Sequence, residues 1–299
     1  MGFKARLKRS KFIMRCYNKL LPYYCRFFTK SAVKMLYKQT FQKPLDLKNP
    51  RDLNEKINWL KVYKYKKDPL VIQCADKYRM REYVKNCGCE ELLNELYGVY
   101  YNYKEIDIKA FPEQFVLKLN RGAGMNYICL DKTQVDEKSL STMAKKWFHN
   151  ECGERYGELH YRKARPCIIC EKYLGDEAGN YPIDYKVYTF NGKVHMVELC
   201  LDRKDKVKFL HVDSNYNKLV YTCESESEDL PVKPDCFEKI IEYAEKLSKP
   251  FCHVRIDFYV YNGMPLVGEL TFTSCGGFDT YLNQQALDVM GDLLVLPKK

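Results

Sequence analysis

The sequence predicts an α+β protein that begins with a basic helical arm, and three observations support this. Residues 253–272 alternate between apolar and polar side chains on both sides of an Asn-Gly pair, which is typical of a β-hairpin. Apolar residues recur at helical spacing over residues 51–86, 235–249 and 283–296. The first 44 residues are strongly basic and also have helical spacing. Separate helical and strand runs of this kind indicate an α+β layout.

The N-terminal arm carries the excess of positive charge. Twelve of the 50 Lys and Arg residues lie between residues 1 and 44, and no Asp or Glu precedes Asp46, which leaves 38 basic against 39 acidic residues elsewhere. The pattern predicts amphipathic helices with a break near Pro22, and such basic helices lie on anionic membrane surfaces. The alternative is a helix packed on the main domain with its basic face in water. No nucleic-acid-binding module follows, so nucleic acid is not an expected partner.

The composition indicates a soluble globular protein of the cytoplasm, peripheral at the inner face of the plasma membrane if the arm binds lipid. The 299 residues are 46% hydrophobic and contain no apolar run of transmembrane length. Basic residues interrupt the apolar stretches near the N-terminus, so no signal peptide is expected. The 14 scattered cysteines are expected to be reduced. Cys167 and Cys170 are spaced like zinc ligands, but they face opposite sides of a predicted strand.

A helical segment follows the arm. Its apolar residues form two stripes within residues 51–86, and Asp68-Pro69 separates them. A strand, a glycine-rich loop and a second strand are predicted over residues 115–130. Lys118 lies near the end of the first strand and Gly122-Ala123-Gly124 follows, so a cation and free backbone N–H groups could meet a phosphate there. The alternative is an ordinary hairpin turn.

Two further strand regions carry charged residues. Residues 167–174 form a short buried strand that ends in Glu171-Lys172-Tyr173-Leu174, and this could be any strand with a charged exit. In the next strand Asp184 and Lys186 point to the same face, and an Asn-Gly turn at residues 191–192 returns the chain to residues 194–199.

The C-terminal hairpin carries the strongest candidate site. A three-residue loop over residues 261–263 would set Arg255 opposite Glu269 with Asp257 diagonal to it, whereas a two-residue turn would send Glu269 to the other face. We therefore expect the three-residue loop. Carboxylate oxygens on adjacent strands, with a hydroxyl-rich loop over residues 273–277, suit Mg²⁺ that holds the phosphates of a nucleotide. A solvated face with cross-strand ion pairs is the alternative.

These segments together resemble the ATP-grasp enzymes. Arg255-x-Asp257-Phe258 followed by Gly268-Glu269-Leu270-Thr271 is similar to their metal-binding strands, R-x-D-F and then E-x-N, and GELTFT is closest to the TupA-like group, named for teichuronopeptide synthesis. The resemblance covers roughly residues 50 to 297 and includes, in the family's order, residues 75–78, 115–120, 168–174 and 184–193.

The resemblance implies a fold of two α+β subdomains that clasp ATP, over residues 111–299, after an arm (1–50) and a helical segment (51–110). It implies that Asp257, Glu269 and Thr271 bind Mg²⁺, with threonine in place of the superfamily's asparagine. The implied ATP-binding residues are Lys118, Gly122, Ala123, Gly124, Glu171, Lys172, Tyr173, Leu174, Asp184 and Lys186, with alanine in place of the serine of the N-x-G-S-G loop. Residues 76–77 only mark a boundary.

The implied reaction is ATP- and Mg²⁺-dependent ligation of a carboxylate to an amine through an acyl phosphate. Lys118 and Lys186 would neutralise the phosphates, and Arg255 would stabilise the transferred charge. The catalytic residues would be Arg255, Lys186 and Arg203, of which Arg203 is the candidate for binding the substrate carboxylate. The family's setting suggests attachment of an amino acid or amine to a uronic acid of a cell-surface polysaccharide. Two alternatives stay open: a glycosyltransferase of capsule synthesis that uses a nucleotide-sugar, and a non-catalytic scaffold at the membrane surface.

Overall fold

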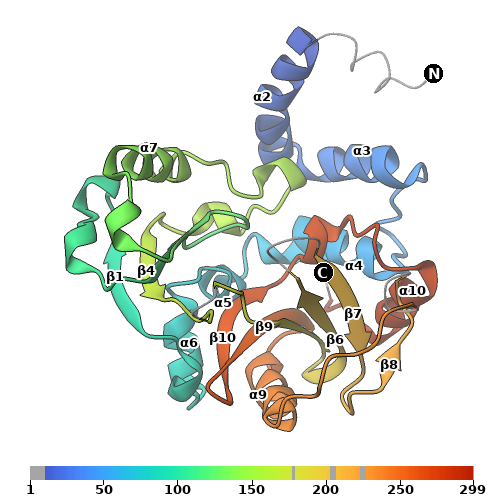
Figure 1. The fold of residues 1–299 in the computed structure, drawn as a ribbon. Coiled ribbons are helices and arrows are strands. Elements are labelled where there is room, and N and C mark those ends of the chain that lie inside the picture. The colour runs from blue at the N-terminus through green and yellow to red at the C-terminus, as the bar shows by residue number, and fades with distance from the viewer. Residues whose placement is uncertain (1–10, 177–178, 203–206, 223–226, 299) are drawn as a thin grey trace.

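Two antiparallel sheets form the framework of the protein. The computed structural model describes residues 11–176, 179–202, 207–222 and 227–298 (Figure 1). The smaller sheet has the strand order β1-β4-β2-β3 and the larger one β10-β9-β5-β6-β7-β8. The strands are β1 (Leu96–Tyr100), β2 (Phe115–Leu119), β3 (Asn126–Cys129), β4 (Ile168–Lys172), β5 (Asp184–Phe190), β6 (Lys193–Leu201), β7 (Lys208–Val212), β8 (Lys218–Leu219), β9 (His253–Tyr261) and β10 (Met264–Thr271).

Helices surround the sheets, and the predicted helical stretches after the arm are confirmed. The helices are α2 (Lys11–Phe27), α3 (Thr29–Phe41), α4 (Leu53–Leu60), α5 (Pro69–Cys74), α6 (Met80–Asn86), α7 (Glu137–Phe148), α9 (Phe237–Ser248) and α10 (Gln284–Leu293). Asp52 starts α4 by accepting a hydrogen bond from the Glu55 N–H, and Asp68 starts α5 in the same way ahead of Pro69. A π-helical turn, Lys61–Tyr65, continues α4.

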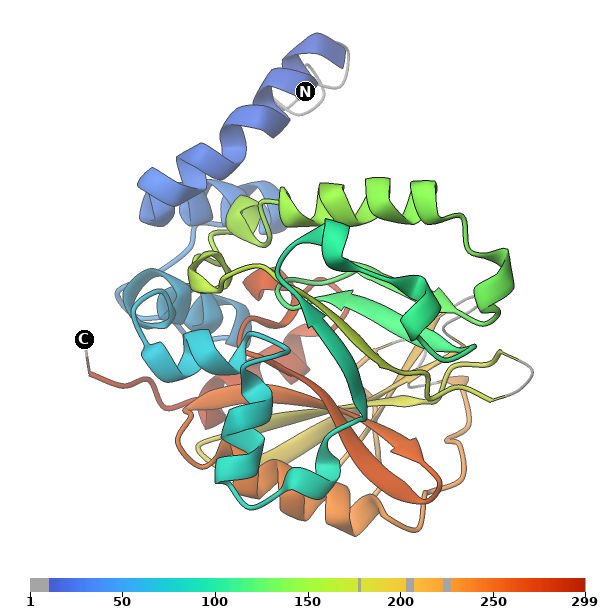
Figure 2. The same cartoon turned by 90° about the vertical axis from the view of Figure 1, so that its left-hand side faces the viewer.

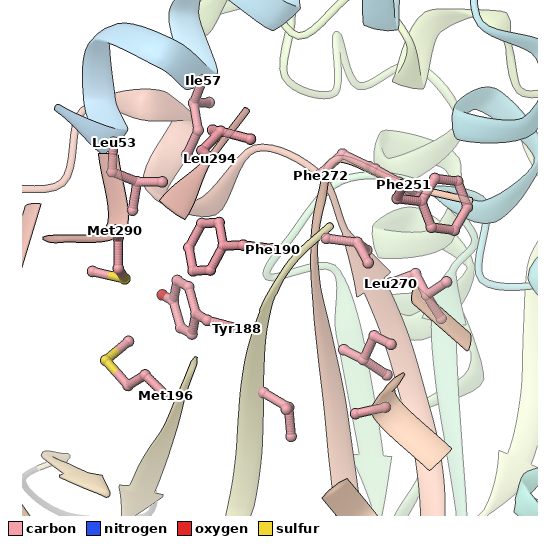
Figure 3. Close-up of a cluster of buried hydrophobic side chains, with 14 of the residues drawn as sticks. Leu53, Ile57, Tyr188, Phe190, Met196, Phe251, Leu270, Phe272, Met290 and Leu294 are labelled. Carbon is pink, nitrogen blue, oxygen red and sulfur yellow. The ribbon is translucent and has the colours of Figure 1, made fainter. Parts of the chain in front are cut away.

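The larger sheet is covered on both faces. On one face Tyr188, Phe190 and Met196 pack against Leu53 of α4 and Met290 of α10 (Figure 3). On the other face α9 packs against β5, β6 and β9. The smaller sheet has a core of its own, in which strand residues pack against α7. These two cores hold the sheets as separate walls, and the candidate site lies between them.

The N-terminal arm folds as two helices, and the expected break near Pro22 is wrong. Helix α2 continues through Pro22 and ends at Phe27. Proline removes one helical hydrogen bond and clashes with the preceding turn, but Leu21 and Cys25 on either side of it are buried against the body of the protein. Burial of these side chains offsets the cost of the proline. The upper part of α2 projects away from the rest of the molecule (Figures 1 and 2).

Among the described residues, no helix has both the length and the apolar character needed to cross a membrane.

Candidate functional site

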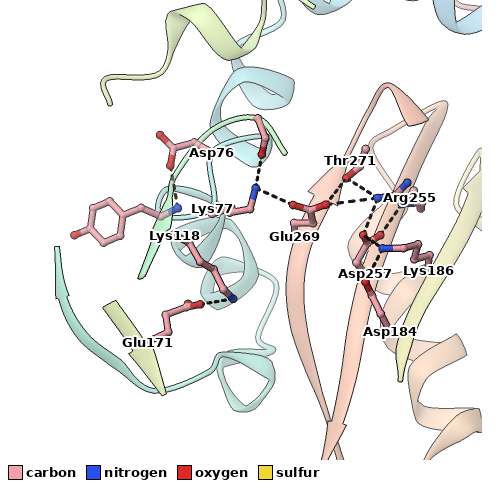
Figure 4. A network of polar contacts seen from close by, with 12 residues as sticks. Asp76, Lys77, Lys118, Glu171, Asp184, Lys186, Arg255, Asp257, Glu269 and Thr271 are labelled. Atoms are coloured by element: carbon pink, nitrogen blue, oxygen red, sulfur yellow. Dashed lines mark hydrogen bonds and ion pairs between the residues drawn. The ribbon is translucent and has the colours of Figure 1, made fainter. Parts of the chain in front are cut away.

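The candidate site is a cavity between the two sheets. From the smaller sheet and its glycine-rich loop come Lys118, Gly122 and Gly124, and from the larger sheet come Asp184, Asp257 and Glu269. Figure 4 shows these charged side chains on the facing walls of the cleft. The structure thus brings together residues that the sequence places up to 151 positions apart.

The register of the β9–β10 hairpin differs from the predicted one. Met264 pairs with Tyr261, so the turn has two residues, Asn262 and Gly263, both with positive φ. The expected three-residue loop is therefore wrong. The register then shifts by one residue at Gly268, where an added Cβ would lie 2.8 Å from the Tyr259 ring.

The bulge at Gly268 places Glu269 on the same face of the sheet as Asp257 and Arg255. Val267 pairs with Phe258 before it and Glu269 pairs with Asp257 after it, while Thr271 pairs with Arg255. Without the bulge a two-residue turn would put Glu269 on the opposite face. The two carboxylates therefore lie directly opposite one another on adjacent strands.

Asp257 is the most enclosed of the charged groups, with 2% of its side chain exposed. Both of its oxygens accept hydrogen bonds from Arg255, each at 2.7 Å. Lys186 Nζ lies 2.9 Å from Asp257 Oδ2 and 2.6 Å from Asp184 Oδ2. Burial would lower the pKa of Lys186, but Asp257 and Asp184 outweigh burial and raise this pKa. Lys186 is therefore a firmly protonated cation.

Three cations stabilise the charged form of the Glu269 carboxylate. Lys77 Nζ lies 2.8 Å from its Oε2, and Arg255 NH2 lies 3.5 Å from its Oε1. Burial would raise the pKa of Glu269, but Lys77, Arg255 and Lys186 together hold this pKa well below its usual range. Thr271 donates to Glu269 and accepts a hydrogen bond from Arg255. All three predicted metal ligands thus lie in one network with the basic side chains.

Lys77 is a site residue that the sequence reasoning missed, because residues 76–77 served only as a boundary marker. Its Nζ also donates to the Gly122 carbonyl at 2.8 Å, and its N–H donates to the Asn120 carbonyl. The buried Asn120 side chain donates to Asp76 at 2.7 Å and so fixes the turn that carries Lys77. The signal available in the sequence was that two polar pairs, residues 76–77 and 120–121, both follow apolar segments.

The smaller sheet supplies Lys118, whose Nζ lies 2.9 Å from Glu171 Oε2. Burial would lower the pKa of Lys118, and Glu171 more than reverses this. Arg81 also pairs with Glu171, at 3.2 Å, so the Glu171 carboxylate is held by two cations on the cleft wall. Gly122 and Gly124 have left-handed φ angles, and both line the cavity together with Lys118. Ala123 lies between them and also lines the cavity.

A second cavity adjoins the first and is more apolar. Lys118 and Tyr259 line both cavities. The second cavity is also lined by three residues that the sequence predicted as ATP-binding, Lys172, Tyr173 and Leu174, together with Asn94, Val116 and Ile128. The Lys172 carbonyl accepts a hydrogen bond from Asn94 at 2.9 Å. A mostly apolar cavity next to a cleft that contains lysines has the polarity that an aromatic ring with an attached polyphosphate requires.

The family model described as TupA-like ATPgrasp matches residues 55–295. The chain belongs to the TupA-like ATP-grasp family. The predicted resemblance and the predicted fold class, an ATP-grasp fold after N-terminal helices, are both confirmed. A search of curated proteins finds no match.

Solved structures that resemble this TupA-like protein include D-alanine–D-alanine ligases and the ATP-grasp ligase PsnB. D-alanine–D-alanine ligase from Bacillus anthracis, complexed with ATP, is 13% identical over 80% of this chain and 62% of that chain, with a TM-score of 0.40. ATP-grasp ligase PsnB, complexed with its minimal precursor, Mg and ADP, is 11% identical over 81% and 65%, with a TM-score of 0.40. D-alanine–D-alanine ligase from Coxiella burnetii is 12% identical over 81% and 62%, with a TM-score of 0.44. The chain spans less than two thirds of each of them.

The loop after β10 contains Ser274–Gly277 and follows Thr271, which belongs to the polar network of the site. Lys61 is fully buried beneath this loop and donates to the carbonyls of Gly276 and Tyr156, at 2.5 and 2.7 Å. Thr273 donates to Glu158, which is also buried. The loop is thus tied to two other segments of the chain. Arg203, the predicted anchor for a substrate carboxylate, lies outside the described residues.

Proposed function

We propose that the protein is an ATP- and Mg²⁺-dependent ligase that joins a carboxylate to an amine, with release of ADP and phosphate. The observation that carries this proposal is the convergence of Lys77, Lys118, Lys186 and Arg255 on one cleft that also holds Asp257 and Glu269. Lys77 and Lys118 line the cleft, and Lys186 and Arg255 reach it through Asp257. Together with a divalent metal on the two facing carboxylates, these four cations would favour a polyanionic ligand.

The donor set fits Mg²⁺ that is bound together with phosphate. Within the part of the chain that the structure describes, no group of three or more His, Cys, Asp or Glu side chains is arranged as a metal site. Mg²⁺ is usually held by one or two carboxylates, several waters and the oxygens of substrate phosphates. Asp257 and Glu269 supply the carboxylates, and the Thr271 hydroxyl is beside them. The bound metal would neutralise phosphate charge.

The nucleotide would span the two cavities. Its base would occupy the cavity lined by Tyr173 and Leu174, and its phosphates would extend past Lys118 toward Lys186. The basic side chains are already ordered by Glu171, Asp184 and Asp257, so little reorganisation is needed when they meet developing negative charge. The glycine-rich loop would cover the phosphates with its backbone N–H groups.

The chemistry follows from this arrangement. A carboxylate oxygen of the acid attacks the γ-phosphorus of ATP, the bond to ADP breaks, and an acyl phosphate forms. The amine nitrogen then attacks the acyl carbon, phosphate leaves, and the amine loses a proton. Arg255 and Lys186 would stabilise the charge on the transferred phosphoryl group. No nucleophilic side chain is required.

We further propose that the acid is a uronic acid of a cell-surface polysaccharide or its precursor, and that the amine is an amino acid or a related amine. The support is the chain's membership of the TupA-like family. The reaction would take place in the cytoplasm, with the basic N-terminal segment, residues 1–44, at the anionic inner face of the plasma membrane.

The test is to follow ADP release and to trap the acyl phosphate. With Mg²⁺, ATP and an array of uronic acids, ADP should form only with the right acid, and hydroxylamine should convert that acid to its hydroxamate. Lys118→Met should reduce ADP formation at least 100-fold, whereas Lys104→Met, at an exposed position, should leave it unchanged. Formation of AMP, or transfer of a sugar from a nucleotide-sugar, would contradict the mechanism.

A further inference from the structure

Helix α2 has two apolar faces, and only one of them is buried. Leu21 and Cys25 pack with Ala32 and Leu36 of α3 in a small core. A second set recurs at intervals of three and four residues and therefore forms one stripe along the helix. This exposed stripe consists of Leu20, Tyr23, Tyr24 and Phe27, which are 65%, 54%, 36% and 67% exposed, and Phe28 extends it with 61%.

The exposed stripe is unusual because several large apolar side chains lie close together, and not because of any single residue. Single exposed apolar side chains are common, but five large ones within nine residues form a contiguous patch, and such patches mark interaction surfaces. The stripe lies in the C-terminal half of α2, next to α3, and the N-terminal half of the same helix projects from the body (Figure 2). No described segment of the chain covers it, as its exposure shows.

Basic residues lie beside the stripe. Arg15, Lys19 and Arg26 recur at intervals of four and seven residues, so they form a row along α2 next to the apolar stripe. The Arg26 guanidinium lies 5.1 Å from the centre of the Phe27 ring. Exposed Lys30 and Lys34 continue the positive charge onto α3, and the first acidic residue of the chain is Asp46. An apolar stripe with a basic border is complementary to an anionic lipid surface.

The buried face of α2 contacts the loop that follows β10. Phe278, at the end of the loop that follows β10, packs against the small core of Leu21 and Cys25. The Cys25 thiol also lies 3.5 Å from the Arg155 carbonyl, one residue before Tyr156, which Lys61 ties to the loop after β10. A surface that meets the exposed stripe would therefore lie about 10 Å, one helix diameter, from this loop.

We propose that residues 20–28 dock the protein on an anionic bilayer and hold the loop after β10 close to the lipid headgroups. Aromatic side chains would enter the interface, and the basic row would contact anionic headgroups. The further implication rests on the proposed ligase function: the acid is presented on a membrane lipid, next to the loop that follows Thr271 of the site. Docking itself needs neither ATP nor the acid.

The test is sedimentation of the full-length protein with vesicles of phosphatidylcholine alone or mixed with phosphatidylglycerol. The protein should bind the mixed vesicles and not the neutral ones. Phe27→Ser/Phe28→Ser should weaken this binding more than tenfold, because each phenylalanine loses its burial in the interface. The matched control is Tyr281→Ser/Val232→Ser, which alters residues that are 68% and 92% exposed elsewhere on the protein, and it should bind like the wild type.

A second variant separates charge from apolar contact. Arg15→Gln/Lys19→Gln/Arg26→Gln should weaken binding at least tenfold at low salt, while Lys138→Gln/Lys145→Gln/Lys146→Gln on α7 should not. Absent binding to mixed vesicles, equal binding to neutral ones, or equal loss in the control variants would overturn the docking. Lys118→Met serves to separate the two proposals, since it should lose ADP formation and keep vesicle binding. If docking fails while ADP formation persists, only the membrane inference is lost.

Discussion

Lys77 and Glu269 join the two walls of the cleft through an ion pair of 2.8 Å. The same lysine donates to the Gly122 carbonyl of the glycine-rich loop, so one ammonium group bridges the proposed phosphate-binding wall and the proposed metal-binding wall. Lys77 therefore acts as a local cation on a carboxylate that Mg²⁺ would also use. If Glu269 binds Mg²⁺ as proposed, its ion pair with Lys77 would compete with the metal in the absence of nucleotide.

This competition predicts an unusual effect of removing a positive charge. Lys77→Met should bind Mg²⁺ about tenfold more tightly than the wild type when no nucleotide is present. The reason is that Mg²⁺ no longer has to displace the Lys77 ammonium from Glu269. Isothermal titration with Mg²⁺ measures this. Lys85→Met, which removes an exposed pair with Glu90, is the matched control and should show no change. Unchanged or weaker Mg²⁺ binding in Lys77→Met would argue against Glu269 as a ligand.

The two proposed metal ligands should differ in how much they stabilise the fold. Asp257→Asn and Glu269→Gln should each reduce Mg²⁺-dependent ADP formation at least 100-fold. Asp257→Asn should also lower the free energy of unfolding by about 3 kcal/mol, because it leaves Arg255 and Lys186 buried without their shared carboxylate. Glu269 is more exposed, so Glu269→Gln should cost about 1 kcal/mol.

Urea denaturation and coupled ADP assays on the same samples test both statements. The prediction of two ligands is contradicted if either variant retains turnover. Equal stability of the two variants would contradict the stronger enclosure of Asp257.

Much of this site could be predicted from local patterns, and the missing parts have physical reasons. Alternation of side chains identified β9 and β10, and with them Arg255, Asp257 and Glu269. Their register depended on a bulge at Gly268, where a Cβ would lie 2.8 Å from the Tyr259 ring, and this bulge lies outside the turn sequence. Register is a property of paired strands, so the hairpin sequence alone did not determine it.

Lys77 and the path of α2 were missed for a similar reason. Lys77 reaches the site because the buried pair of Asp76 and Asn120 joins segments 44 residues apart. Helix α2 continues through Pro22 because Leu21 and Cys25 are buried by distant parts of the chain. In both cases long-range packing decided an outcome for which local propensity is a weak guide.

Acid should destabilise the protein below pH 6.5 through buried histidine. Burial, and then the nearby Lys61, lower the pKa of His160 from 6.5 to about 3. The unfolded chain takes up a proton below pH 6.5 while the folded protein does not, so stability is full above pH 6.5 and falls as pH drops toward 3. Between about pH 7.5 and 5 this one group should cost about 2 kcal/mol.

His160→Leu should remove that part of the pH dependence. Neither ring nitrogen of His160 has a hydrogen-bond partner in the described structure, so leucine breaks no such bond and should stabilise the protein at every pH. Urea denaturation at two pH values measures how the free energy of unfolding changes with pH. His149→Leu, at an exposed position, is the control and should keep the wild-type slope. An unchanged slope in His160→Leu would show that His160 is protonated in the folded protein.

The two N-terminal helices should respond differently to deletion. Helix α3 contributes Val33 and Tyr37, both fully buried, to the main hydrophobic core, whereas α2 contributes Leu21 and Cys25 to a small separate one. Removal of residues 1–28 should therefore leave a folded protein that has lost vesicle binding and retains ATP binding. Removal of residues 1–44 also takes Tyr37 and Val33 out of the core, at a cost of roughly 3 kcal/mol or more for each large side chain. Thermal unfolding of the two truncated proteins measures the difference. Equal melting temperatures would mean that α3 is as dispensable as α2, and loss of ATP binding in the shorter deletion would mean that α2 supports the cleft and not only the membrane contact.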